Sequence, residues 1–343
     1  MAATPWLGGR PADNERLAAW ALSRIAATGA EDACVDAVID IVYAARDTEA
    51  DLGGRFGSGV VGEPATRRPE RRQSFHLDGI SPLRLREEDS DEPWAVLLDP
   101  ARLLRGIGTV TQASRSQEGI DLTVTAHPDF ADPTDPWLPP GAHSLTVQLD
   151  PDTGFLRSAA LHDEQGTLAT AQVSDLNVRD APPSTQAGEI LARMARTLLE
   201  PTRLTAEVHI ETDPHEDLSI TSVPASRSWT ILVDENTLTM TGDYAPDRTS
   251  PAAARLAELL TPARIVSHLA NVTPTSPHSL QATVRPLRTF PFSAWAPDDA
   301  LTCHFTVDPE TGVLVRAAAT ARGRTVFRHT VTALGPDGHT YSP

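Results

Sequence analysis

The alternation of hydrophobic and polar positions predicts helices and strands along this chain. Apolar residues recur at helical spacing over 14–27 and over 185–199, which predicts an amphipathic helix at the start of each half. Residues 302–307, TCHFTV, instead alternate with period two, which is typical of a half-buried antiparallel strand. Residues 33–44 fit a strand, although this segment could also continue as a helix.

Both halves predict the same order of elements. Each helix is followed by a strand, with the second of these at 204–211, then by a strand pair, and then by a helix that begins at a proline. Asp99 with Pro100 marks the start of that helix in the first half, and Ser250 with Pro251 marks it in the second. Four further strands close each half; in the second half they lie at 280–287, 300–307, 313–321 and 324–334. The strand pairs are expected at 72–86 and 227–242.

An internal repeat explains this agreement. The segment LDPDTGFL begins at Leu149, and VDPETGVL begins 158 positions later at Val307. At that offset, 17 of the 57 positions in 120–176 are identical to those in 278–334. The sequence therefore predicts a tandem duplication, with a first repeat at 1–181 and a second at 182–343. A proline-rich linker at 179–186 separates them, and 53–70 is expected to be a long loop of the first half.

The repeated D-P-[DE]-T-G segment predicts a hairpin turn. Aspartate accepts hydrogen bonds from nearby backbone, proline presets φ, and glycine adopts the left-handed conformation. A calcium loop would also start with spaced oxygen ligands, but it needs a downstream bidentate carboxylate. Phe155-Leu156-Arg157 and Val313-Leu314-Val315 follow the two copies and supply none. We therefore expect an α+β fold in which each repeat is a curved antiparallel sheet of about seven strands covered by two helices.

Composition narrows the classes of function. The net charge of −17 opposes binding to nucleic acid and to anionic membranes. All 29 basic residues are arginine, which excludes a lysine Schiff base or a P-loop lysine. Cys34 and Cys303 are expected to be buried, unpaired residues. No export signal or membrane-spanning run is visible, so a cytoplasmic location is expected.

Two tryptophan loops are the strongest candidates for a functional site. Residues 133–142 and 291–300 share the pattern P-x3-W-x-P-x2-A, with Trp137 and Trp295 at equivalent positions. Each ring could close a cavity or could cap its own core. The eleven histidines include no metal-spaced set and no nucleophile motif, so no catalytic, metal or cofactor residue is expected. A cleft that gathered His304, His329 and a carboxylate would favour an enzyme.

The acidic segments 86–92 and 213–217 are either solvated turns or a surface for a basic protein partner.

The second strand pair, the LLTPAR segment at 259–264 and the strand-turn-strand at 307–331 resemble the lipoprotein-carrier superfamily, which includes LolA, the RseB-type sensors and mycobacterial lipid-carrier lipoproteins. The resemblance implies that each repeat is an open half-barrel around an apolar cavity for acyl chains. We therefore expect a non-enzymatic protein that binds an apolar or acyl-containing ligand. The alternative is a cytoplasmic interaction or regulatory protein with filled cores. The candidate ligand-binding residues are Trp137, Trp295, Phe292, Trp229 and Met240.

Overall fold

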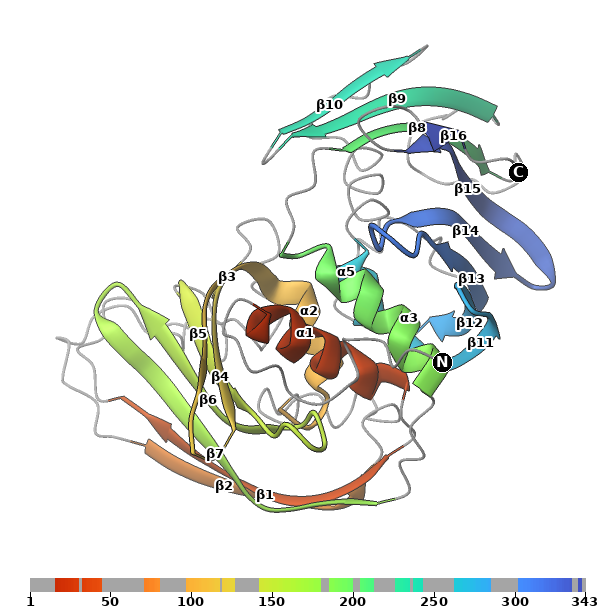
Figure 1. The fold of residues 1–343 in the computed structure, drawn as a ribbon. Coiled ribbons are helices and arrows are strands. Elements are labelled where there is room, and N and C mark those ends of the chain that lie inside the picture. The colour runs from red at the N-terminus through yellow and green to blue at the C-terminus, as the bar shows by residue number, and fades with distance from the viewer. Residues whose placement is uncertain are drawn as a thin grey trace, which may run out of the picture. The chain divides into compact units, whose positions relative to one another are not determined.

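The chain folds as two antiparallel sheets with few helices, an α+β architecture (Figure 1). The computed structural model describes residues 16–30, 33–44, 71–80, 97–117, 119–126, 142–179, 185–199, 204–212, 226–234, 237–242, 262–284, 302–334 and 339–340. The described helices are α1 (Leu17–Ala27), α2 (Leu103–Gly106), α3 (Thr185–Arg196) and α5 (Ala263–Val266), with 3-10 turns η1 (Thr28–Ala30) and η6 (Pro100–Arg102).

The first sheet has seven described strands in the order β2-β1-β7-β6-β5-β4-β3. Their bounds are β1 (Cys34–Tyr43), β2 (Arg71–Ile80), β3 (Ile107–Arg115), β4 (Ile120–Ala126), β5 (Ser144–Leu149), β6 (Leu156–Asp163) and β7 (Gly166–Arg179). All neighbouring strands pair antiparallel. Strand β1 pairs with β7, the last strand of the first sheet in the sequence.

The second sheet has nine described strands in the order β10-β9-β8-β15-β14-β13-β12-β11, with β16 paired to β15. Their bounds are β8 (Leu204–Thr212), β9 (Ser226–Asp234), β10 (Thr237–Gly242), β11 (Leu269–Ser276), β12 (Ser279–Val284), β13 (Thr302–Val307), β14 (Leu314–Ala321), β15 (Arg324–Leu334) and β16 (His339–Thr340). Helix α3 packs against β11, β12 and β13 of this sheet.

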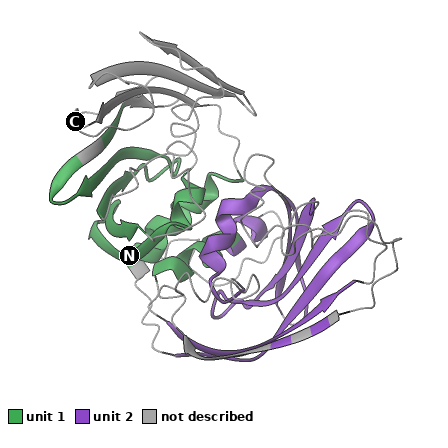
Figure 2. Ribbon diagram, turned by 180° about the vertical axis from the view of Figure 1, so that it is seen from behind, with its two compact units in different colours: residues 1–10, 22–31, 183–343 green, residues 11–21, 32–182 purple. Residues whose placement is uncertain are grey.

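Contacts divide the chain into two compact units (Figure 2). Unit 1 consists of Met1–Arg10, Leu22–Glu31 and Pro183–Pro343 and contains the second sheet. Unit 2 consists of Pro11–Ala21 and Asp32–Pro182 and contains the first sheet.

The two sheets share one strand order and one register. The run β2-β1-β7-β6-β5-β4-β3 corresponds strand by strand to β9-β8-β15-β14-β13-β12-β11. Thr146 pairs with Ala160 in the first sheet, and His304 pairs with Ala318 in the second, each 158 positions further on. The offset seen in the sequence is therefore also an offset between paired positions in the two sheets.

Several predicted elements are confirmed. Residues 34–43 form a strand, which settles the choice between strand and helix, and β9–β10 is the predicted second strand pair. In the first half only β2 of the predicted pair is described, because 81–96 lie outside the described residues. Ser250 and Pro251 also lie outside them, whereas Pro100 does begin a short 3-10 turn. Asp99 makes no side-chain capping bond there, so it does not act as the expected N-cap.

The sequence missed strands β3 and β11. The pairing of β3 with β4 is shifted twice by bulges, which breaks the period of two that identifies a strand. Strand β11 carries Pro274, a residue that argues against a central strand. Both lie at the end of their sheet's strand order, where proline and bulges are tolerated.

Alternation along each strand separates a core face from an open face. In β5, Leu145, Val147 and Leu149 are fully buried while the residues between them are partly exposed. Burying each side chain of this kind contributes about 1.5–3 kcal/mol to folding. Because full burial leaves no water-sized space beside these side chains, this part of the apolar face is filled core.

Both D-P-x-T-G segments form the predicted hairpin turns. The Asp150 carboxylate accepts hydrogen bonds from the backbone N–H groups of Asp152 and Thr153, at 2.8 and 3.0 Å. Asp308 likewise accepts from the Thr311 N–H at 2.8 Å. Gly154 and Gly312 have φ of 81° and 79°, the left-handed conformation that the motif requires.

Gly312 also lies against helix α3, which gives the first prediction. A Cβ at Gly312 would lie 2.3 Å from the Arg193 carbonyl oxygen, whereas a Cβ at Gly323, with nearly the same φ of 77°, meets nothing within 4 Å. G323A therefore measures only the cost of placing a non-glycine residue in the left-handed conformation, about 1 kcal/mol. We expect G312A to lower the free energy of unfolding, measured in urea, by about 1–3 kcal/mol more than G323A does. Equal losses would mean that the turn does not pack on the helix.

Candidate functional site

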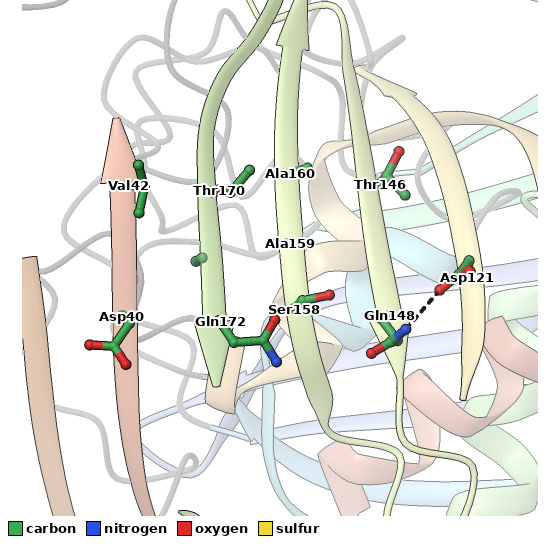
Figure 3. Close-up of a pocket in the computed structure, with 11 residues that line it drawn as sticks. Asp40, Val42, Asp121, Thr146, Gln148, Ser158, Ala159, Ala160, Thr170 and Gln172 are labelled. Atoms are coloured by element: carbon green, nitrogen blue, oxygen red, sulfur yellow. Dashed lines mark hydrogen bonds between the residues drawn. The ribbon is translucent and has the colours of Figure 1, made fainter. Parts of the chain in front are cut away.

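The open face of the first sheet is hollowed into a groove (Figure 3). Its volume is about 310 Å³, and residues of β1, β4, β5, β6 and β7 line it. That volume is at the lower end of the range for small-molecule sites. The groove is thus a site of small-ligand size on the face opposite the packed core.

One row of polar side chains crosses the groove from strand to strand. Antiparallel register pairs Asp40 with Gln172, Gln172 with Ser158, Ser158 with Gln148, and Gln148 with Asp121. Directly paired residues share one face of a sheet, so all five project to the open side, as Figure 3 shows. Each row position is one strand spacing, about 4.8 Å, from the next.

Small side chains in the adjacent row make the face concave. Val42 pairs with Thr170, Thr170 with Ala160, and Ala160 with Thr146. Ala160 and Ser158, both on the central strand β6, carry the shortest side chains of the two rows. The space above β6 is therefore bounded by longer groups on both sides, and Val42 and Ala160 give it a short apolar wall.

Part of the hydrogen-bonding capacity of the row is already used. The Gln148 Nε2 donates to Asp121 Oδ1 and to Ser116 Oγ, both at 3.2 Å, and Ser74 Oγ donates to Asp40. The side chains of Gln172, Ser158 and Thr170 bond to no group in the described part of the chain. Because the Gln148 amide nitrogen is engaged, its carbonyl oxygen is left to accept. The centre of the groove therefore offers both acceptors and donors to a ligand, with the Gln148 oxygen an acceptor only.

The two carboxylates of the groove lack an arginine partner within the described residues, unlike other aspartates of the same sheet. Asp36 is paired with Arg179 at 2.8 Å, and Asp150 with Arg157. Burial would raise the pKa of Asp150, but hydrogen bonds from Arg157, Thr153 and Asp152 and the Arg157 charge outweigh it and lower that pKa. Among the described residues, Asp40 and Asp121 accept side-chain hydrogen bonds only from the neutral donors Ser74 and Gln148. Neither carboxylate is therefore neutralised by an ion pair within the described residues, although the exposed Arg72 pairs with Val42 and shares this face of the sheet.

The matching face of the second sheet carries arginine at two positions that are uncharged in the groove. At the 158-residue offset, Ser158 and Thr170 correspond to Arg316 and Arg328, which are both exposed. Thr146 corresponds to His304, and Asp121 corresponds to Ser279. Arginine thus replaces Ser158 and Thr170, while Ala160 corresponds to another alanine, Ala318. The groove is therefore a feature of the first sheet's own sequence and not a consequence of the shared strand order.

The predicted ligand-binding residues lie elsewhere or outside the described residues. Trp137, Phe292 and Trp295 fall in segments that the structure does not describe. Trp229 lies in β9 and Met240 in β10, where the register pairs Met240 with Ile231. None of the five is among the described groove residues. Sequence reasoning missed the groove because its residues come from five strands, although the polar positions of SLTVQL in β5 carried part of the signal.

The histidines that could have indicated an enzyme do not come together. His329 pairs with Ala317, and Ala317 with the buried Phe305. His304 instead pairs with Ala318, which pairs with the exposed Arg328. His329 and His304 thus lie on opposite faces of the sheet. In the described part of the chain, no three His, Cys, Asp or Glu residues are grouped so as to hold a metal.

The side chains of His329 and Cys303 are buried, and burial shifts the pKa of each. Burial lowers the pKa of His329 to about 4, against an opposing hydrogen bond between its Nε2 and the Leu314 carbonyl at 3.3 Å. Its Nδ1 is buried and has no hydrogen-bond partner among the described residues. Burial also raises the pKa of the Cys303 thiol to about 12, which makes it unreactive. Cys34 is only half-buried, contrary to expectation.

Comparison with known proteins adds little to this site. No protein-family model matches the chain, and no curated protein matches it. The chain is similar to a solved complex of MucA and MucB from Pseudomonas aeruginosa, with 13% identity, a TM-score of 0.23, and coverage of 92% of this chain and 93% of that chain. A structure of MucB in complex with MucA(peri) matches with 13% identity, a TM-score of 0.22 and the same coverage. Among the described helices, none has the length and apolar character needed to cross a membrane.

The buried histidine gives a prediction about acid stability. An unfolded histidine has a pKa near 6.5, so the unfolded state takes up a proton that folded His329 refuses until about pH 4. Stability is therefore highest above pH 6.5 and falls as pH decreases towards 4. We expect the wild type to lose roughly 3 kcal/mol more than H329L over this interval, measured by urea unfolding at each pH. H304L is the exposed-histidine control. Parallel pH profiles of wild type and H329L would contradict the prediction.

Proposed function

We propose that this chain is a non-enzymatic binding protein, and that the groove across the first sheet binds a polar, positively charged ligand. The observation that carries the proposal is the pair Asp40 and Asp121, which face one groove and have no arginine partner among the described residues. A ligand that donated hydrogen bonds to both would neutralise them. Hydrogen bonds to charged groups contribute more than neutral ones, about 1.5–3 kcal/mol each.

We also propose that the chain arose by duplication and consists of two domains, 1–181 and 182–343. The matching strand order and the 158-residue offset in register support this proposal. In this account the two copies kept one scaffold and diverged on the open face, where Ser158 corresponds to Arg316. Fold and ligand are then separate properties: buried positions retain the scaffold, while exposed positions change what it binds.

The apolar-ligand hypothesis stays a prediction. It requires a cavity near Trp137, Trp295, Phe292, Trp229 and Met240, whose side chains lie outside the described part of the structure. The described apolar face offers it little room, since Leu122, Leu145 and Val147 are fully buried. A half-barrel that held an acyl chain would have to build its cavity from other residues. A basic protein segment is a third candidate and is compatible with the charge of the groove.

The proposed function predicts selective binding that depends on the groove. We expect native mass spectrometry to detect a 1:1 complex with cationic polar ligands from a panel of amines, neutral sugars and fatty acids. The variant S158R/T170R, which installs the arginines of the second sheet, should abolish that complex because it fills and neutralises the groove. The matched control R316S/R328T alters the other sheet and should leave binding intact.

Titration with a lipid extract tests whether the protein binds an apolar ligand instead of a cationic one. Binding of a fatty acid or lipid that shifts tryptophan emission, at equal strength in wild type and S158R/T170R, would contradict the groove proposal and favour the apolar cavity. With the groove as the binding site, we expect lipid to leave both the emission spectrum and the native mass unchanged.

A further inference from the structure

We infer that the ligand of this groove is a linear aliphatic polyamine that lies across the strands, with its terminal ammonium groups at Asp40 and Asp121. This inference rests on the proposed binding function and adds the chemical class of the ligand. It follows from the shape of the groove, the position of its charges and the polarity of the groups between them.

The charges stand at the two ends of an extended site. Asp40 on β1 and Asp121 on β4 are four strand spacings apart in the row. At about 4.8 Å per spacing, this separation is about 19 Å along the sheet. A single compact cation, such as one ammonium or guanidinium group, cannot contact both carboxylates. The ligand must therefore be long and must carry positive charge at each end.

The groups between the two aspartates are uncharged and can accept hydrogen bonds, although Gln172 and Ser158 can also donate them. Gln172 and Ser158 have no bonding partner in the described chain, and the Gln148 carbonyl oxygen is left over after its nitrogen donates to Asp121. A protonated secondary amine is a donor without an acceptor, and it suits such a row. A neutral oligosaccharide presents donors and acceptors in equal measure and would leave both carboxylates uncompensated, at a desolvation cost.

The size and the wall of the groove favour a thin aliphatic chain. A volume of about 310 Å³ accommodates a small flexible molecule better than a folded protein segment. Val42 and Ala160 place methyl groups beside the polar row, where methylene units between the amines can pack. A polyamine that lies along the groove can therefore place its amines against the polar row and its methylene groups against Val42 and Ala160.

The inference predicts that affinity depends on ligand length. Calorimetric titration of the full chain at physiological salt should show 1:1 binding of the tetraamine spermine. 1,4-Diaminobutane should bind at least about tenfold more weakly, because it reaches only one carboxylate. Equal affinity for the two would overturn the inference while leaving the proposed binding function standing. Binding of neither amine would overturn the inference, and the proposed function would be contradicted only if no cationic ligand of the wider panel bound the groove.

Charge and shape variants locate the ligand. D40N and D121N should each weaken spermine binding about tenfold, because each removes one charge-assisted contact. D175N is the matched control: Asp175 is an exposed aspartate on β7 that does not line the groove. D175N should change the affinity less than about twofold, because Asp175 does not contact the ligand and its exposed charge is screened by salt. If all three variants lost affinity equally, the binding would be general attraction to an acidic protein, and the inference would fail.

A variant without a charge change completes the test. A160L extends a larger side chain into the hollow between Thr146 and Thr170 while leaving both aspartates in place. It should abolish spermine binding and leave the circular dichroism spectrum and the unfolding midpoint close to those of the wild type. Unimpaired binding by A160L would overturn the inference. An arginine-rich peptide that bound the wild type while spermine did not would also overturn it and would assign the groove to a protein partner.

Discussion

The burial of one face of the first sheet in the core determines which side chains line the groove on the other face. A strand places successive side chains on opposite faces, so the buried row of Ile41, Ala171, Ala159, Val147 and Leu122 fixes which residues reach the open side. A slip of one residue in any of these strands would bury Gln148 or Ser158 and expose Val147 or Ala159. Burial of the apolar side chains therefore sets the register, and this register in turn places the polar row on the other face. Selection can alter that row without loss of the core.

The two sheets illustrate this separation. Positions that face the core keep an apolar character at the 158-residue offset, as in Leu122 and Leu280 or Val173 and Val331. An exception is informative: Ala171 corresponds to His329, which is buried with an unsatisfied Nδ1. On the open face the correspondence fails repeatedly, with serine and threonine in one sheet and arginine in the other. If the sheets are copies, they have diverged where the cost in folding free energy is small.

The sequence predicted those features that depend on neighbouring residues and missed those that depend on residues far apart in the chain or on irregular strands. The D-P-x-T-G turns, helix α3 and strand β13 were predictable because each depends on neighbouring residues. Strands β3 and β11 were not, since bulges and Pro274 hide their period. The groove depends on Asp40 pairing with Gln172, 132 positions away in the chain, and on small residues meeting on β6. A comparison of exposed positions at the 158-residue offset would have revealed Ser158 and Thr170 as the places where the halves differ in charge.

The central claim is that ligand recognition occurs on the open face of the first sheet, between Asp40 and Asp121. The most direct measurement is amide chemical-shift mapping of the isotopically labelled chain during titration with spermine. The account predicts saturable shifts confined to the groove segments of β1, β4, β5, β6 and β7, with the second sheet unaffected. Shifts spread over acidic positions of both sheets, or absent from the groove while present elsewhere, would contradict it.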